Sequence, residues 1–261
     1  MRETNHEFPG RNAADARVAL GERSIWRSEM GRALWIGIAN VGSLAAAALA
    51  RAEGDIGLVI SGGQIVTTTI SEEGDPLGPA RVFSATFSNI GGTWYTDDPG
   101  LQIGTGTLSP GSNLGMYFTR ALRQWNGSNF DLVSGGRVGT TFGLPSNSIS
   151  TPLSDVNTGN IIFPVEGSGG LHDHPDWVLE NSDPGTDPYF FLVEARFTSD
   201  QGGLTDSLPF SIVFGANADE SELEAMEDWV RENVIPAPAS LALLGVLACG
   251  CTRRSRASSA G

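Results

Sequence analysis

The sequence predicts an all-β protein built as a single antiparallel β-sandwich or jelly-roll-like domain. Between residues 55 and 214, apolar residues recur at every second position, which is the pattern of strands with one buried face. The segments between these runs are rich in Gly, Asn, Asp and Pro, the residues that favour turns. About ten short strands at this spacing are typical of a sandwich.

The first 52 residues have the composition of targeting segments rather than of the domain. Residues 1–29 are polar and without periodicity, and we interpret them as a non-native leader from an overlong gene start. Residues 30–52 have a basic start, an apolar stretch and small residues at Ala50 and Ala52, the order found in secretory signal peptides. Cleavage there leaves Glu53 as the first mature residue. An N-terminal membrane anchor is the alternative.

We assign the β-sandwich domain to residues 53–215 because the alternating runs fall within these bounds. In the longest run, the polar residues Glu194 and Arg196 take the opposite parity, which predicts one buried and one exposed face. The alternating apolar residues are Phe83, Ala85 and Phe87; Leu114, Met116 and Phe118; Val138 and Phe142; Ile161, Phe163 and Val165; Tyr189, Phe191, Val193, Ala195 and Phe197; and Phe210, Ile212 and Phe214.

A helical period appears only after the last strand, over residues 216–235. Asn217 or Asp219 is positioned to cap this helix, and acidic residues follow in its first turn, where the helix dipole favours negative charge. We expect an acidic helical spacer that docks one apolar stripe on the sandwich, with a frayed linker as the alternative. The stripe consists of Leu223, Met226, Trp229 and Val230.

The C-terminal segment, residues 236–256, has three parts: a pair of prolines, an apolar run and an arginine cluster. The run of thirteen residues, 239–251, would span roughly 20 Å as a helix, less than the ~30 Å of a hydrocarbon core. We therefore expect a short transmembrane helix that anchors the chain temporarily, with its arginines on the cytoplasmic side. A core helix or an ordinary tail anchor is the alternative. The residues that define this signal are Pro236, Ala237, Pro238, Arg253 and Arg254.

This tail resembles the PEP-CTERM sorting signal of bacterial envelope and exopolysaccharide-associated proteins. The family has Pro-Glu-Pro where this chain has Pro236-Ala237-Pro238. The resemblance implies that an exosortase-type enzyme in the inner membrane cuts near the prolines, and that the body then reaches the cell surface or the extracellular matrix. It implies as partners the secretion machinery, the processing enzyme and extracellular polysaccharide.

The charge and the cysteine content exclude several classes of function. The chain has a net charge of −14 and no lysine, and residues 53–235 contain six arginines against 25 acidic residues. Such a body repels nucleic acid and anionic lipid. Both cysteines, Cys249 and Cys251, lie in the tail, so the body has no disulfide, no thiol nucleophile and no thiolate metal site.

The strongest candidate for a binding site is the pair His172 and His174, the only histidines of the body. In an extended segment, residues two apart point the same way, so both imidazoles can meet one cation. Asp173, Asp176 or Glu180 would supply a carboxylate, and we take His172, His174 and Asp176 as the predicted metal site. The alternative is a turn with two exposed imidazoles.

The surrounding segment, residues 171–214, resembles a repeated β-sandwich domain of surface-anchored bacterial proteins. In that family a His-x-His motif precedes a strand with Trp or Phe, as His172 and His174 precede Trp177 here. The resemblance implies a surface module that handles a metal or another ligand.

Two further binding chemistries are possible from the composition. The acidic turns at 97–100 and 183–187 group carboxylates that suit calcium, although Asp-Pro-Gly is also what a tight turn needs. Four aromatic residues suit a sugar-stacking platform, although such residues are more often core. They are Trp94, Tyr95, Trp125 and Trp177.

The sequence shows no nucleophile elbow, phosphate-binding loop, dinucleotide fingerprint or zinc-protease motif. We therefore predict a secreted, surface-sorted and non-enzymatic protein of the bacterial envelope or exopolysaccharide matrix. The alternative function is a surface module that binds a divalent metal ion through His172 and His174, or a carbohydrate through exposed aromatic residues.

Overall fold

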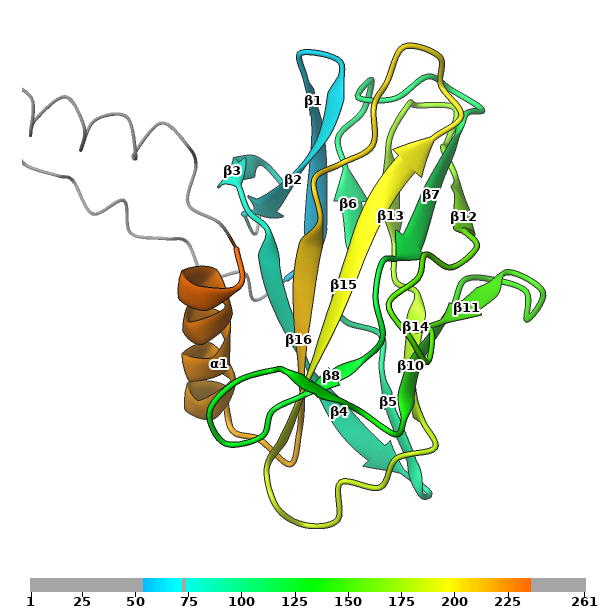
Figure 1. The fold of residues 1–261 in the computed structure, drawn as a ribbon. Coiled ribbons are helices and arrows are strands. Elements are labelled where there is room, and N and C mark those ends of the chain that lie inside the picture. Colours follow the sequence, from blue (N-terminus) through cyan, green and yellow to red (C-terminus); the bar gives the residue numbers. More distant parts are fainter. Residues whose placement is uncertain (1–53, 72–73, 236–261) are drawn as a thin grey trace, which may run out of the picture. The chain divides into compact units, whose positions relative to one another are not determined.

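The computed structural model describes residues 54–71 and 74–235, which form two β-sheets and one helix (Figure 1). The predicted all-β sandwich is therefore confirmed. The predicted leader, the signal peptide with its cleavage site at Ala50, Ala52 and Glu53, and the sorting tail lie outside the described residues.

The smaller sheet has five strands in the order β13-β6-β1-β2-β3. Its longest ladder is the hairpin of β1 and β2, whose turn at Gly62 and Gly63 has φ angles of 57° and 80°. Positive φ at both turn residues suits glycine and matches the twist of the strands. The bounds are β1 (Ile56–Ser61), β2 (Gln64–Ile70), β3 (Pro76–Pro79), β6 (Leu101–Ile103) and β13 (Leu171–Asp173).

The larger sheet follows the order β11-β10-β14-β5-β4-β16-β15-β7-β12, and β8 and β9 branch from β15. The first part of β4 pairs with β16 and its end pairs with β5, so the sheet curls at this strand. The bounds are β4 (Val82–Ile90), β5 (Thr93–Thr96), β7 (Asn113–Phe118), β8 (Arg123–Gln124), β9 (Leu132–Val133), β10 (Arg137–Thr141), β11 (Ser148–Ser150), β12 (Ile161–Pro164), β14 (Asp176–Glu180), β15 (Tyr189–Ser199) and β16 (Phe210–Ala216).

Two strand pairs depart from the predicted antiparallel pattern. β1 runs parallel to β6, and β4 runs parallel to β16. The partners in each parallel pair are separated by long stretches of chain, as parallel pairing requires. A sequence pattern of alternation cannot reveal such pairs, because it fixes the faces of a strand and not its neighbours.

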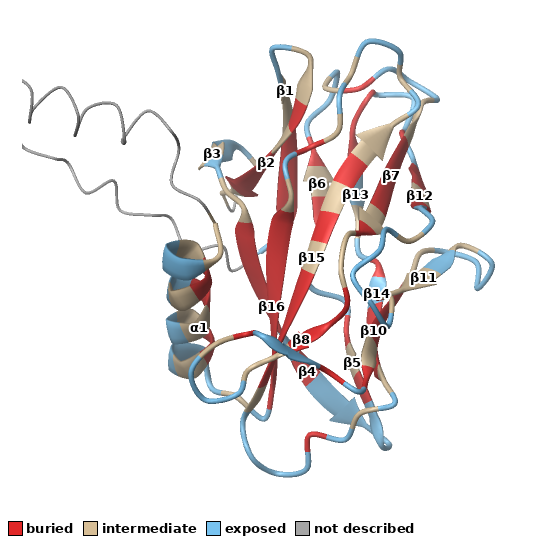
Figure 2. Cartoon of the chain, in the orientation of Figure 1, coloured by how far each residue is buried: buried red, intermediate tan, exposed pale blue. Residues whose placement is uncertain are grey.

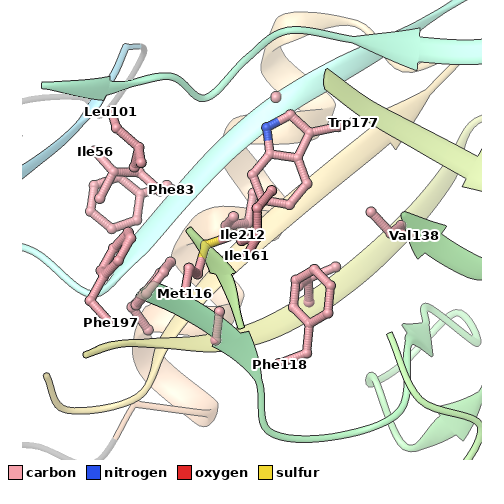
Figure 3. Packing of buried hydrophobic residues seen from close by; sticks show 14 of the residues in the cluster. Ile56, Phe83, Leu101, Met116, Phe118, Val138, Ile161, Trp177, Phe197 and Ile212 are labelled. Atoms are coloured by element: carbon pink, nitrogen blue, oxygen red, sulfur yellow. The ribbon is translucent and has the colours of Figure 1, made fainter. Parts of the chain in front are cut away.

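The main core lies between the two sheets, where the predicted alternating residues are buried except Phe142 and Tyr189, which are partly buried at its margin (Figures 2 and 3). Ile56 and Leu101 of the smaller sheet belong to one cluster with Phe83, Phe197 and Ile212 of the larger sheet. Phe197 stacks on Phe210 with ring centroids 4.9 Å apart. Because the described body holds no cysteine, this apolar burial supplies the main stabilisation of the sandwich.

The helix α1 (Glu220–Asn233) packs against the outer face of the larger sheet and contacts β4 and β16 (Figure 1). Asp219 begins it with a capping box, in which its side chain accepts from the Glu222 backbone and the Glu222 side chain accepts in return. Leu223 and Val230 are buried in a second apolar cluster, so the prediction of a docked helix is confirmed.

Among the described residues, no helix combines the length and the apolar character needed to cross a membrane. The predicted C-terminal transmembrane helix falls outside them.

Candidate metal centre

His172 and His174 lie side by side at the point where the chain passes from the smaller sheet to the larger one. His172 is in β13 and His174 follows it, and β14 of the larger sheet begins two residues later. The extended backbone of this segment places both imidazoles together, with ring centroids 5.5 Å apart. This is the arrangement that their spacing predicts.

Asp55, at the start of the sandwich domain, is the third member of the group. It directly precedes β1, and Ile56 of β1 is paired with Leu101 of β6, which in turn is paired with Asp173 of β13. This pairing brings its carboxylate to the two histidines. Its Oδ2 lies 3.1 Å from His172 Nε2, and its Oδ1 lies 3.7 Å from His174 Nε2.

The three ligand atoms lie within 4.8 Å of one another, and among the described residues this is the one group of three or more potential metal ligands. The side chains of His172 and His174 are 60% and 41% exposed, whereas that of Asp55 is 13% exposed. A cation would therefore rest on a largely buried carboxylate and remain open to solvent on the side of the histidines.

The orientation of His174 is set by the turn that precedes β6. Its Nδ1 lies 3.2 Å from the backbone carbonyl oxygen of Asp97, and a carbonyl can only accept, so Nδ1 carries the hydrogen. The other ring nitrogen, Nε2, then faces Asp55 and is the one available to a metal ion. A backbone carbonyl behind the ring is how proteins commonly fix the tautomer of a metal-binding histidine.

Asp98 stands at the margin of the group, with Oδ1 3.6 Å from His174 Nδ1. Burial raises the pKa of Asp98, and the neighbouring charge of Asp97 raises it further, while His174 opposes both effects. Asp98 thus adds a second carboxylate next to the histidine pair.

Gly100 leaves the room that the group needs. A Cβ at this position would lie 2.5 Å from Asp55 Oδ1 and 2.7 Å from His174 Cε1 and Nδ1. The absence of a side chain therefore lets the turn approach Asp55 and His174 closely.

Two imidazole nitrogens and a carboxylate form a ligand set that suits zinc and other divalent transition metals. Calcium prefers six to eight oxygen ligands, which this group does not offer. The residues thus fit a transition metal that keeps some coordination positions for water or an external ligand.

The carboxylate of this group is not the one that the sequence suggests. Asp176 accepts a hydrogen bond from the Tyr95 hydroxyl at 2.8 Å and is not part of the group. This hydrogen bond, with burial, raises the pKa of Tyr95 to about 12. Glu180 is likewise engaged elsewhere, where it accepts from the Ser150 hydroxyl. No local signal identifies Asp55, because only strand pairing brings it to the histidines.

Two of the four aromatic residues considered for a sugar-stacking platform are core residues, which was the alternative interpretation. Trp177 is fully buried in the core and donates from Nε1 to the carbonyl oxygen of Pro99, and Trp94 is also buried. Trp125 packs against Phe130 and against Trp229 of the helix. These rings have packing roles, and Trp94 and Trp177 cannot present a face to a sugar.

Among the described residues, neither acidic turn brings three carboxylates together. At 183–187, the Asp183 carboxylate accepts from the Gly185 backbone, which is a turn interaction, and no group of three ligands gathers there. The turn at 97–100 instead borders the histidine pair.

No protein-family model and no curated protein matches the chain. Among solved structures, the CooA pilin subunit from enterotoxigenic Escherichia coli is similar, with a TM-score of 0.29 and 14% sequence identity. The similarity covers 57% of this chain and 96% of the pilin. A likeness of this size carries no functional argument.

Proposed function

We propose that this chain is an exported, non-enzymatic surface protein whose β-sandwich binds a divalent transition metal ion. The observation that carries the proposal is the convergence of Asp55, His172 and His174, whose ligand atoms lie within 4.8 Å of one another. The body has two histidines, and the fold places both against one carboxylate.

The electrostatics of the body support binding of a cation. Residues 53–235 have 19 more acidic than basic residues, and a field of this sign raises the local concentration of cations near the surface. The histidines then select among cations, because imidazole favours transition metals over calcium and magnesium.

The test is calorimetric titration of the full-length protein with zinc, manganese and calcium. We expect zinc to bind the wild-type protein, and we expect the His172→Ala/His174→Ala variant to bind it at least roughly 100-fold more weakly. Asp176→Ala is the control, because its carboxylate is held by Tyr95, and it should bind zinc as the wild type does. No zinc binding, or equal binding by the double variant, would contradict the proposal.

Export and sorting are supported by the sequence alone. The signal peptide at 30–52 and the tail with Arg253 and Arg254 predict secretion, cleavage before Glu53 and processing by an exosortase-type enzyme. In the native bacterium we expect mass spectrometry to find Glu53 as the mature N-terminus, and the body at the surface or in the extracellular polysaccharide matrix. A protein that stays in the cytoplasm with residues 30–52 attached would contradict this part of the proposal.

A further inference from the structure

The larger sheet has a short edge strand whose two side chains are both apolar and exposed. β9 pairs with β8 on one side, and among the described residues no strand pairs with its other side. Leu132 and Val133, the two residues of β9, are 46% and 45% exposed. Edge strands commonly carry charged residues or prolines that discourage pairing with another chain. β3, an edge of the smaller sheet, begins and ends with proline, whereas β9 contains neither a proline nor a charge.

The free side of β9 offers the two backbone polar groups of Val133. The Ser134 N–H donates to the Leu122 carbonyl oxygen at 2.9 Å, so these two residues form a hydrogen-bonded pair. Hydrogen-bonded and non-hydrogen-bonded pairs alternate along an antiparallel ladder, so the next pair, Arg123 and Val133, is not hydrogen-bonded. The N–H and the carbonyl oxygen of Val133 therefore point away from β8, toward the free side of the strand.

Two more exposed apolar residues lie next to β9. Asp155 accepts from the Ala121 N–H at 3.1 Å and pairs with Arg123 of β8, which holds its loop against the same part of the sheet. Leu153 and Val156 lie close to Asp155 in this loop and are 71% and 54% exposed. These residues make up half of the eight exposed large apolar residues of the described chain. The surface that we call the β9 edge consists of Leu132, Val133, Leu153 and Val156.

The β9 edge belongs to the least acidic stretch of the body. Residues 119–160 contain three of the six arginines of the body and two of its 25 acidic residues, which gives a net charge of +1. Glu180 and Glu194 reach this stretch from neighbouring strands, and each accepts a hydrogen bond from a hydroxyl within it. The rest of the body has three arginines against 23 acidic residues. Two copies of the chain therefore repel each other least when their 119–160 stretches meet.

We propose that the β9 edge is the surface through which two copies of this chain associate. A second copy fits this surface because it brings the same apolar side chains and the same free backbone groups, and because its least acidic stretch then meets its own counterpart. A two-fold axis beside Val133 sets the two β9 strands antiparallel, and each Val133 N–H donates to the carbonyl oxygen of the other. The apolar side chains are removed from water, which drives the association. This inference does not depend on the metal centre.

The test is sedimentation velocity of the full-length protein at low and high NaCl concentration. We expect a dimer that forms more tightly at high salt, because salt screens the repulsion between the acidic bodies. Val133→Asp should weaken dimerisation at least roughly tenfold, since it removes apolar burial and sets two like charges opposite each other. Ile90→Asp is the matched control and should dimerise as the wild type does, because Ile90 is 62% exposed at the end of β4, outside the β9 edge.

A mixture of Val133→Asp and Val133→Arg tests the two-fold arrangement. We expect the mixture to dimerise at least roughly tenfold more tightly than either variant alone, because opposite charges then meet across the axis. Circular dichroism checks the fold, and Leu153→Ser, which should also weaken dimerisation, decides the question if Val133→Asp does not fold.

Four results would overturn the proposal. The first is a wild-type protein that stays monomeric at both salt concentrations, and the second is equal dimerisation of Val133→Asp and the wild type. The third is association that weakens as salt rises, which indicates a contact between opposite charges instead. The fourth is a mixture of Val133→Asp and Val133→Arg that associates no more tightly than its components.

Discussion

At the scale of single residues, Gly100 controls the space behind the metal centre. We expect Gly100→Ala to weaken zinc binding roughly tenfold or more, because the new methyl group would displace Asp55 and His174 from each other. Calorimetric titration with zinc measures the effect. Gly159→Ala is the matched control, since a Cβ there meets open space. A Gly100→Ala protein with unchanged affinity would show that the spacing of these two side chains does not matter.

Glu227 is the residue whose ionisation opposes the docking of the helix. Burial raises the pKa of Glu227, while Ser84 and Arg231 favour its charged form and Asp228 opposes it. Because the pKa of Glu227 is raised in the folded state, protonation of Glu227 stabilises the fold. This stabilisation is fully present below the ordinary glutamate pKa, and it is lost as the pH rises through the raised pKa of the folded state.

We therefore expect Glu227→Gln to unfold with the same or a higher free energy than the wild type at pH 7. The difference in the free energy of unfolding between Glu227→Gln and the wild type should shrink or reverse as the pH falls below the ordinary glutamate pKa. Urea unfolding at a series of pH values measures it, with Glu232→Gln, an exposed residue of the same helix, as the control. A wild type that gains no stability relative to Glu227→Gln on acidification would contradict this explanation.

At the scale of elements, the curled larger sheet has its edge strand β12 covered by a side chain. The Asn147 amide donates to the Ile162 carbonyl oxygen at 2.7 Å and accepts from the Ile162 backbone at 2.8 Å. It thus pairs with both polar groups of Ile162, as a neighbouring strand would. Phe142 and Phe163 pack next to this contact, with ring centroids 5.0 Å apart. Exposed strand edges can pair with other chains. The contact with Asn147 occupies the backbone groups of Ile162 at the edge of β12.

We expect Asn147→Ala to lower the free energy of unfolding by about 1–3 kcal/mol, because it leaves both polar groups of Ile162 without their partner. Chemical denaturation measures the change. Asn157→Ala, on an exposed loop nearby in sequence, serves as the control. Equal stability of the two variants would show that Asn147 does not hold the edge.

The strand β15 is covered on both faces, which alternation alone does not predict. The alternation in β15 correctly predicts the face that holds Phe191 and Phe197 in the core. Phe190 and Leu192 on the opposite face are buried under α1, although the alternation suggests that this face is exposed. Consecutive apolar residues are the signal of a strand covered on both sides, and this run carries it.

At the scale of the whole molecule, the sequence predicts the fold class well because periodicity and turn residues are local properties. The sequence also predicts the histidine pair, since two residues in one extended segment share a face. The sequence does not predict the role of Asp55, because the position of Asp55 depends on the pairing of β1, β6 and β13. Asp176 is nearer to the histidines in sequence than Asp55, but it begins β14 of the larger sheet and accepts a hydrogen bond from Tyr95.

The central claim is that Asp55, and not Asp176, completes a metal centre with the two histidines. The most direct test is calorimetric zinc titration of the wild-type protein, Asp55→Asn and Asp176→Asn. Loss of the ligand charge should weaken binding by roughly 10–100-fold in Asp55→Asn and leave Asp176→Asn unchanged. Zinc affinity that falls in Asp176→Asn and stays unchanged in Asp55→Asn would contradict the account.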